Sequence, residues 1–292
     1  MKLDLVMWTY NGERTLNTVL NQINRVVPSE VVGQKLIVDD GSTDNTVSIA
    51  KSCGWQVIPN EGKGISDGAN TALKHVRSDW FASFEQDLML NPDWLYIMAQ
   101  SIGRIGWEKV GAVSGVRFAN QPSSLTKLQE YVYKKYIGEG KIPAWLRSRQ
   151  FSSFTLGKTL DNTLWNTFIL NQIGGYPKCK NNAGIDTLLA YRLHSSGYKW
   201  IVNYNVKSVH LRRGGLKEEL KHQYWYASSL KETWAQMEQD GVKPPINKKG
   251  IAFRFFTSPF TGAFVALKTR DPKIAFVHPL IRLYYLWGLL KN

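Results

Sequence analysis

The sequence predicts an α/β protein with a mostly parallel sheet covered by helices on both faces. Three observations in the first hundred residues support this prediction. Short apolar runs alternate with segments whose apolar residues recur at helical spacing, the loops between them are short, and each apolar run ends in a polar cluster. At 292 residues the chain is long enough for one large domain, or for one domain with an appendage.

The elements follow in order along the chain. Each predicted strand is a short apolar run that stops at turn-forming or acidic residues, and each predicted helix follows one of these stops. We expect strands at Lys2–Trp8, Lys35–Val38, Trp55–Ile58 and Trp80–Phe84, with helices through Thr15–Ile23, Val47–Lys51 and Ser66–His75.

Polar residues gather where the predicted strands end. In a parallel sheet the carboxyl ends of the strands share one edge, and ligands bind in the crevice outside that edge. The four clusters are Thr9–Glu13, Asp39–Asp44, Asn60–Gly64 and Glu85–Asp87. Their common placement predicts a binding site at this edge.

Glu85 and Asp87 stand one residue apart after the strand Trp80–Phe84. Residues i and i+2 of an extended segment point the same way, so the two carboxylates repel unless a cation lies between them. Mg²⁺ or Mn²⁺, together with a substrate phosphate, suits such an oxygen-rich position. The alternative is a solvated acidic turn, but the other polar strand ends favour the metal site.

Two further clusters indicate nucleotide chemistry. Asp39 or Asp40 can accept hydrogen bonds from a base or from ribose hydroxyls, or can stabilise the following turn and helix N-terminus instead. Lys63, between Gly62 and Gly64, can reach a diphosphate, although a lysine in such a turn is often only solvated. The P-loop pattern is missing, so the GKG segment is not a P-loop. The dinucleotide-binding glycine pattern is also missing after the first strand, which argues against a nicotinamide enzyme.

Composition limits the partners. The net charge of +14 indicates attraction to nucleic acid, to an acidic membrane surface or to phosphorylated substrates, and no nucleic-acid-binding motif is present. Eleven Trp and thirteen Tyr are typical of carbohydrate platforms or of the membrane interface. No signal peptide or membrane span is predicted, and the two cysteines are expected to be reduced thiols of a cytoplasmic protein.

The segments WTYNGERTL, LIVDDGSTDNT, NEGKG and FEQD, in this order and at these spacings, resemble the nucleotide-sugar half of family 2 glycosyltransferases of the GT-A fold. The resemblance implies a nucleoside-diphosphate sugar as donor and Mg²⁺ or Mn²⁺ as cofactor. The family's D-x-D motif corresponds here to Glu85-Gln86-Asp87, so Asp87 is the expected ligand and Glu85 departs from the pattern. The implied donor-binding residues are Thr9, Tyr10, Glu13, Asp39, Asp40, Lys63 and Gln86.

The resemblance continues in the second half. IDTLLAYRLHSSGYKW, residues 185–200, is similar to the family's E-D-x-D-L-x-x-R-L segment, with Ile185 and Leu188 replacing two of its acidic residues. It places Asp186 at the position of the general base in inverting members, although a helix N-terminal aspartate is the simpler interpretation.

Strand-like segments at Trp200–Val202 and Val206–Val209 precede His210. The resemblance implies that His210 ligates the metal or touches the diphosphate, and a surface histidine is the alternative. Arg212 and Arg213 would neutralise the departing nucleoside diphosphate, or would simply form a basic surface loop.

We therefore divide the chain into a GT-A catalytic domain at 1–215 and a helical C-terminal extension at 216–292. The catalytic domain comprises a nucleotide-sugar half, 1–100, and an acceptor half, 101–215. The last forty residues interleave aromatic and basic side chains, with Asp271 as their one acid. Such a segment lies in the headgroup region of an anionic membrane or packs on the catalytic domain.

The predicted function is metal-dependent, inverting transfer of a sugar to a hydroxyl or a lipid phosphate. The resemblance makes a glycan or a polyprenyl-linked acceptor attractive, with the enzyme peripheral on the cytoplasmic face of the membrane. The alternatives are a nucleotidyltransferase acting on a sugar phosphate and a non-catalytic basic binding protein. Each fits less well, because TYNGE is a poor nucleotidyltransferase loop and a mere binder needs no acidic strand ends.

Overall fold

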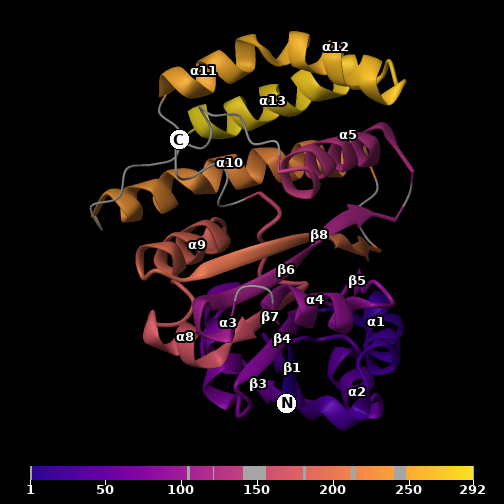
Figure 1. Cartoon of the computed structure of the whole chain (residues 1–292), viewed down its shortest axis with the longest axis vertical. Helices are drawn as coiled ribbons and strands as arrows, with labels where there is room; N and C mark the ends of the chain where they lie inside the picture. The colour runs from indigo at the N-terminus through magenta and orange to yellow at the C-terminus, as the bar shows by residue number, and fades with distance from the viewer. Residues whose placement is uncertain are drawn as a thin grey trace. The chain divides into compact units, whose positions relative to one another are not determined.

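The computed structural model describes residues 2–103, 106–120, 122–140, 156–179, 182–211, 215–239 and 248–291. The chain forms two compact units, each assembled from separate segments (Figure 1). Unit 1 comprises Met1–Arg117, Gly157–Lys178 and Ile185–Leu211. Unit 2 comprises Phe118–Leu156, Cys179–Gly184 and Arg212–Asn292, so it joins a central segment of the chain to the C-terminal helices.

The parallel half of the predicted sheet is confirmed. β1 pairs in parallel with β2 and β4, and β2 pairs in parallel with β3. Parallel neighbours need a crossover connection, and a helix joins each pair of consecutive strands here, as the alternating pattern predicts. The four strands are β1 (Leu3–Thr9), β2 (Val32–Asp39), β3 (Gln56–Pro59) and β4 (Trp80–Phe84).

In the other half of the sheet, β4 with β7, β6 with β7 and β5 with β8 are antiparallel pairs. The whole sheet is therefore mixed, with the order β3-β2-β1-β4-β7-β6-β8-β5. Its strands are β5 (Leu88–Met89), β6 (Val110–Ala119), β7 (Thr163–Asn166) and β8 (Lys199–His210). The two strand-like segments expected near residue 200 are one strand, β8, with His210 as its last residue. Asn203 and Asn205 lie inside this strand despite their low strand propensity.

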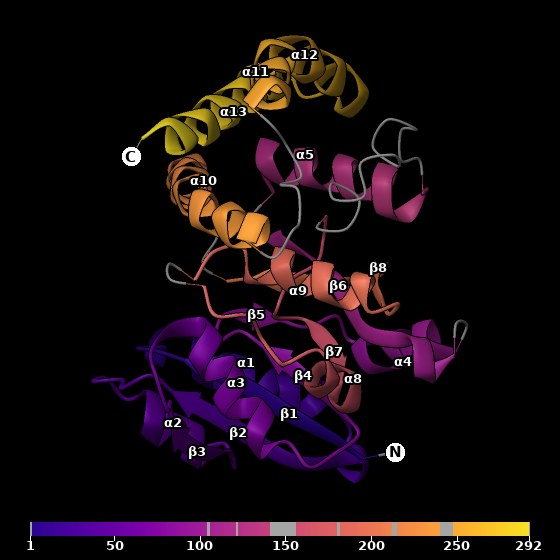
Figure 2. The same cartoon turned by 90° about the vertical axis from the view of Figure 1, so that its left-hand side faces the viewer.

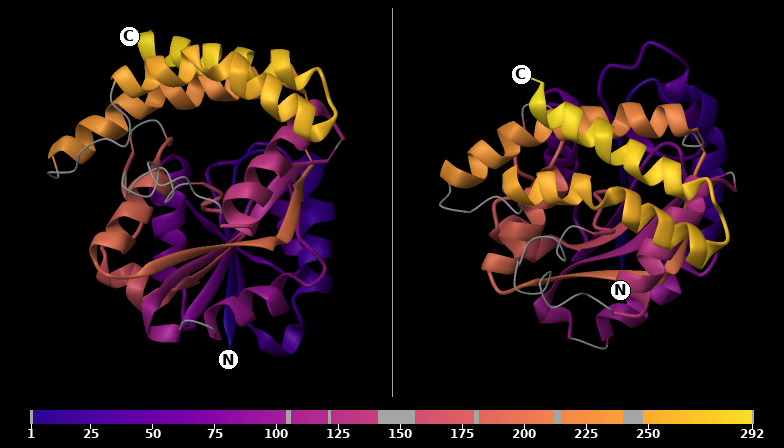
Figure 3. Two further views of the ribbon diagram at one scale, coloured as in Figure 1. Left: turned by 45° about the horizontal axis from the view of Figure 1, so that its top comes forward. Right: turned by 90° about the horizontal axis from the view of Figure 1, so that it is seen from above.

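Helices cover both faces of the sheet in unit 1 (Figure 3). Leu16, Leu20 and Ile23 of α1 and Trp94 of α4 share one buried cluster with β1 and β4. On the other face, Gly111 of β6 lies against Leu193 of α9 and Ile169 of α8, too close to admit a side chain. The helices are α1 (Glu13–Val26), α2 (Thr46–Ser52), α3 (Gly64–His75), α4 (Trp94–Gly103), α8 (Thr167–Gln172) and α9 (Ile185–Ser195), with 3₁₀ turns at Ser29–Val31 and Trp107–Lys109.

Much of the tryptophan content belongs to the core. The Trp165 ring packs against the rings of Tyr176 and Trp200, with centroids 5.4 and 4.8 Å away. Its indole N–H donates to Ser83, so the polar atom is satisfied while the ring is buried. Trp55, Trp80 and Trp94 are buried as well. Composition alone pointed to carbohydrate or membrane surfaces, but these residues stabilise the sheet.

Unit 2 is built from helices. α13 lies between α10 on one side and the pair α11–α12 on the other (Figures 1 and 2). The helices are α5 (Ser124–Tyr133), α10 (Leu216–Gln239), α11 (Lys248–Phe256), α12 (Ser258–Thr269) and α13 (Ile274–Leu290), and a π-helical turn at Lys134–Gly138 continues α5. Within the described residues, none of the helices has the length and apolar character needed to cross a bilayer.

A buried carboxylate ties the central strands together. Asp4 of β1 is 1% exposed and accepts hydrogen bonds from the backbone N–H groups of Arg77 and Ser78, the Ser78 hydroxyl and the Gln34 amide, at 2.7 to 3.2 Å. These donors come from β2 and from the turn that leads into β4. Gly33 allows this approach, because a Cβ there would lie 2.4 Å from the carboxylate.

We expect Asp4→Ala to lower the free energy of unfolding by about 3 kcal/mol, because it leaves several buried donors without an acceptor. Urea unfolding followed by circular dichroism measures this change. Asp79→Ala is the control, since Asp79 is exposed in the same turn and its side chain should contribute little. Equal unfolding midpoints for the two variants would contradict the structural role of Asp4.

Candidate functional site

The carboxyl ends of the parallel strands meet at one edge of the sheet, as predicted. Thr9, the last residue of β1, pairs with Asp39, the last residue of β2, and Asp39 pairs with Pro59 of β3. β4 ends at Phe84, directly before Glu85. The polar clusters that follow these strands therefore start from neighbouring positions.

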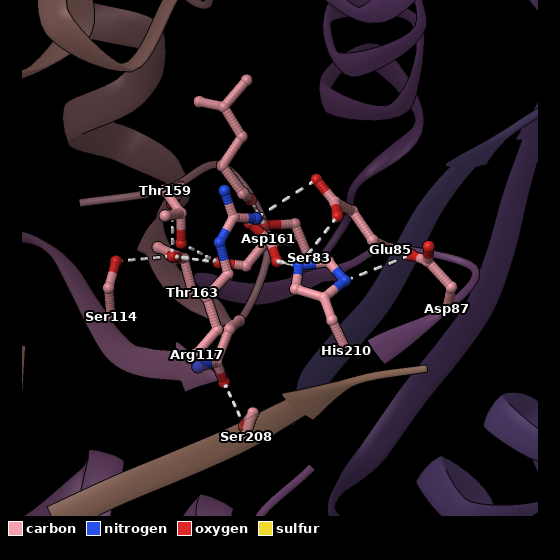
Figure 4. Close-up of polar contacts among 12 residues, drawn as sticks. Ser83, Glu85, Asp87, Ser114, Arg117, Thr159, Asp161, Thr163, Ser208 and His210 are labelled. Carbon is pink, nitrogen blue, oxygen red and sulfur yellow. Dashed lines mark hydrogen bonds and ion pairs between the residues drawn. The ribbon is translucent and has the colours of Figure 1, made fainter. Parts of the chain in front are cut away.

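Glu85, Asp87 and His210 converge beside this edge (Figure 4). β5 follows Asp87 and pairs with the end of β8, with Leu88 opposite His210, so strand pairing brings the histidine to the carboxylates. His210 Nε2 lies 3.4 Å from Glu85 Oε2, and its Nδ1 lies 3.5 Å from Asp87 Oδ1. One donor atom from each of the three residues can be chosen so that all lie within 4.8 Å of one another.

This group fits a divalent cation. His210 is 2% exposed, and among the described residues neither of its ring nitrogens has a hydrogen-bond partner. A buried imidazole without such a partner is unusual, and metal coordination would satisfy one of its nitrogens. Two carboxylates and one imidazole are ligands that Mg²⁺ and Mn²⁺ accept, with positions left for water or phosphate oxygens.

Two residues that sequence reasoning missed complete the charge arrangement. Arg117 Nη1 of β6 lies 2.6 Å from Asp161 Oδ1 and 3.4 Å from Glu85 Oε1. Asp161 is buried, and its Oδ2 is 3.8 Å from His210 Nε2. Arg117 therefore holds Glu85 and Asp161 at one guanidinium, while His210 faces both (Figure 4). The one sequence signal for this role was the position of Arg117, a charged residue inside an otherwise apolar run.

Gln86, the middle residue of the motif, joins two loops. Its Oε1 accepts hydrogen bonds from the Thr9 hydroxyl and, at 3.1 Å, from the Tyr10 backbone N–H. Its Nε2 donates to the Tyr10 carbonyl at 3.2 Å. Gly12 makes room for this contact, because a Cβ there would lie 2.7 Å from Gln86 Oε1. The loop after β1 is thereby held against the loop that carries the acidic pair.

The two acidic residues at the end of β2, Asp39 and Asp40, accept hydrogen bonds from neighbouring loop residues. Asp39 accepts hydrogen bonds from the backbone N–H groups of Gly41 and Ser42 and from the Ser42 hydroxyl, and so stabilises its own turn. Asp40 accepts from the Asn60 amide at 2.8 Å and from the Gly64 backbone N–H at 3.1 Å, which ties the β2 loop to the β3 loop.

Three other predicted residues lie in the same loops. Glu13 Oε2 accepts from the backbone N–H and the side-chain amide of Asn45, both at 3.1 Å. Tyr10 is exposed, and Lys63 is exposed at the N-terminus of α3, with its backbone N–H bonded to Asp67. The loops after β1, β2 and β3 thus form a cross-linked platform from which Tyr10 and Lys63 reach solvent.

Asp186 lies in the first turn of α9, as predicted. Burial raises the pKa of its carboxyl group, and this rise is opposed by a hydrogen bond from the Thr187 backbone N–H and by the charge of Arg117. The Lys158 ammonium is buried, which lowers its pKa to about 7, and the charge of Asp186 opposes that shift. Electrostatic coupling therefore connects Asp186 to Lys158 and to the Arg117 cluster. Lys158 is a third residue that sequence reasoning missed, and nothing in the sequence distinguishes it from other lysines.

The predicted anion-binding residues Arg212 and Arg213 lie outside the described residues. They follow Leu211, whose backbone N–H donates to the Asp87 carbonyl at 2.8 Å.

A comparison with protein families agrees with the resemblance found in the sequence. Residues 4–158, just over half of the chain, match the model of the family described as glycosyl transferase family 2. Among curated proteins, no sequence matches significantly.

Solved structures share the fold at low sequence identity. A mannosyltransferase from Pyrobaculum calidifontis, in complex with GDP-Man and Mn²⁺, is 18% identical, with a TM-score of 0.62 over 98% of this chain and 87% of its own. Glucosyl-3-phosphoglycerate synthase from Mycobacterium tuberculosis, in complex with Mn²⁺ and UDP, is 16% identical, with a TM-score of 0.53 over 83% and 81%. S. aureus TarS, in complex with UDP-GlcNAc, is 15% identical, with a TM-score of 0.51 over 99% and 90%. These similarities confirm the predicted GT-A type fold.

We expect Asp87→Asn to weaken Mn²⁺ binding by at least about tenfold. Loss of a residue that only hydrogen-bonds to a metal ligand already costs that much, and Asp87 would be a ligand itself. Glu85→Gln should cost less, because Glu85 is shared between His210 and Arg117. Isothermal titration calorimetry with Mn²⁺ measures both changes. Asp93→Asn, which alters an exposed carboxylate beyond the motif, is the control. Identical affinities for Asp87→Asn and Asp93→Asn would remove Asp87 from the metal site.

Proposed function

This chain belongs to glycosyl transferase family 2, and from that premise we propose that it catalyses metal-dependent, inverting transfer of a sugar from a nucleoside-diphosphate donor. The observation that carries the proposal is the convergence of Glu85, Asp87 and His210 beside the cross-linked loops at the carboxyl ends of β1, β2 and β3. Family membership favours glycosyl transfer over nucleotidyl transfer and over a non-catalytic basic binder.

The donor would bind on the platform of strand-end loops. Thr9 and Gln86 set the position of the β1 loop, and Asp40 joins the β2 and β3 loops, so these residues prepare the surface before the donor arrives. Asp39 and Glu13 would offer their remaining acceptor capacity to the base and ribose. The exposed Tyr10 ring would lie against the nucleoside, because an aromatic face can stack on a base.

The diphosphate would be held through a divalent cation, Mg²⁺ or Mn²⁺, bound by Asp87, Glu85 and His210. Such a cation, when bound, stabilises the negative charge that develops on the leaving nucleoside diphosphate. Lys63, Arg212 and Arg213 would add positive charge around the same phosphates. The solved neighbours in complex with Mn²⁺ together with GDP-Man or UDP support this assignment.

Asp186 would act on the acceptor. Its carboxylate would take the proton of an attacking hydroxyl while the hydroxyl oxygen forms a bond to the anomeric carbon and the diphosphate leaves. Because burial raises its pKa, Asp186 is a stronger base than an ordinary aspartate. The nearby Lys158 and Arg117 charges favour the ionised form that this role requires.

The acceptor would be a glycan hydroxyl or a polyprenyl-linked phosphate, and the enzyme would work as a peripheral protein on the cytoplasmic face of an anionic membrane. The basic net charge and the aromatic, basic C-terminal helices support the membrane location. A lipid phosphate is already ionised, so transfer to it would need no general base.

Nucleotide binding tests the proposal directly. We expect UDP or GDP to raise the melting temperature only when Mn²⁺ is present, because the diphosphate would bind through the cation. A ligand at a hundred times its Kd adds about 2.7 kcal/mol of stability. Differential scanning fluorimetry with each nucleotide, with and without Mn²⁺, measures the shift, and inorganic phosphate with Mn²⁺ is the control. If no nucleotide stabilises the protein under any condition, the proposed function is wrong.

Asp186→Asn distinguishes the two acceptor classes. For a hydroxyl acceptor, kcat should fall by about 100-fold or more, since a positioned general base contributes at least that much. For the wild type, kcat/KM should decline as pH falls through the raised pKa of Asp186, because protonation removes the base, and the variant should lose this limb. Asp93→Asn is the control. Normal turnover of a hydroxyl acceptor by Asp186→Asn would show that Asp186 is not the base.

A further inference from the structure

Helix α12 in unit 2 has its apolar residues arranged in an unusual way. Its small residues face inward, since Ser258, Gly262 and Ala266 are buried. A Cβ at Gly262 would lie 3.2 Å from the Ala275 carbonyl oxygen and from Pro279 Cδ, so α12 packs closely on α13 through this side. Val265 is buried on this side as well, while the larger apolar residues Phe260, Phe264 and Leu267 are exposed.

These large residues form an exposed stripe. Phe256, Phe260 and Leu267 are 72%, 78% and 81% exposed, and apolar side chains recur every three or four residues along the helices, which places them on one side. We call this surface the outer face of α11–α12, and its residues are Phe253, Phe256, Phe260, Phe264 and Leu267. A helix in water normally buries phenylalanine and exposes polar residues, so this surface is built for an apolar environment.

The surroundings of the outer face are basic. The ammonium groups of Lys135 and Lys268 each lie 5.7 Å from the centre of the Phe264 ring. Residues 248–291 contain eight lysines and arginines and a single acid, Asp271. That acid is buried and paired, because it accepts a hydrogen bond from Ser124 at 3.1 Å and lies 3.3 Å from the Lys127 ammonium. Lys135 and Lys268 therefore bring positive charge to the outer face, and no carboxylate of residues 248–291 compensates it there.

We propose that the outer face of α11–α12 binds an anionic lipid bilayer, with its phenylalanines and Leu267 inserted below the headgroups and its lysines against lipid phosphates. Exposed aromatic side chains flanked by cations match the boundary between acyl chains and anionic headgroups. Because α13 packs on the inward side of α12, only the outer face of α12 would enter the bilayer, and α12 would lie parallel to the membrane surface. This inference deepens the membrane location within the proposed function and assigns it to named residues.

Vesicle co-sedimentation of the full chain tests the proposal. The wild type should bind vesicles of phosphatidylcholine mixed with phosphatidylglycerol more strongly than phosphatidylcholine alone, and added salt should weaken this binding. The triple variant Phe256→Ser, Phe260→Ser, Leu267→Ser should bind at least about tenfold more weakly, because insertion strength follows the apolar area that is buried. Lys135→Gln with Lys268→Gln should reduce the preference for the anionic lipid, because these two ammonium groups flank Phe264.

The double variant Tyr96→Ser, Phe168→Ser is the matched control, since it removes exposed aromatic residues of unit 1, and it should bind vesicles like the wild type. Melting curves of all variants check that the fold is retained. Unchanged vesicle binding by the triple variant, or no binding by the wild type, overturns the proposal.

Light scattering in lipid-free buffer measures self-association. If the wild type self-associates, the triple variant does not, and neither binds vesicles, the face is an interface between copies of the chain. These assays need no turnover, so their failure would leave the proposed sugar transfer standing, and nucleotide-dependent stabilisation tests that separately.

Discussion

The site depends on holding three carboxylates together at the end of the sheet. Glu85, Asp87 and Asp161 all lie within 4 Å of His210, and two of them also contact Arg117. Two like charges 4 Å apart repel by about 4 kcal/mol at the effective dielectric of a protein surface. The Arg117 guanidinium opposes this repulsion, and a bound divalent cation would complete the balance. The mixed sheet serves this arrangement, because β4 carries the acidic motif while β6 and β8 deliver Arg117 and His210.

The sequence revealed the parts of this arrangement that are local. Alternating apolar runs predicted β1 to β4 and the helices between them, and the acidic pair was expected at the end of β4. Residues 86–87 form a turn and not an extended segment, so Glu85 and Asp87 converge with His210 through that turn. Asp186 and His210 came from the resemblance to a family, because each is a single polar residue beside an ordinary element. Arg117, Lys158 and Asp161 were missed, since their roles arise only when strands distant in sequence pair. β5 and β7 are two and four residues long, too short for a periodic signal.

The structure also separates residues that build the site from those that face a ligand. Gln86 and Asp40 use side-chain oxygens or nitrogens to join neighbouring loops, and Asp39 stabilises its own turn. The platform is therefore ordered by the protein itself, which reduces the entropy lost when a donor binds. In unit 2 the apolar stripe of α12 lies on the side opposite its packed face. In both units, the proposals for ligand and lipid binding rest on groups without an obvious role in folding.

The central claim is that Glu85, Asp87 and His210 bind the cation that holds the nucleoside diphosphate. Crystals grown with MnCl₂ and UDP or GDP, measured near the manganese absorption edge, test it most directly. We predict one strong anomalous peak among these three side chains, in contact with the diphosphate. A bound nucleotide with the peak elsewhere, or with no peak, would contradict this metal site.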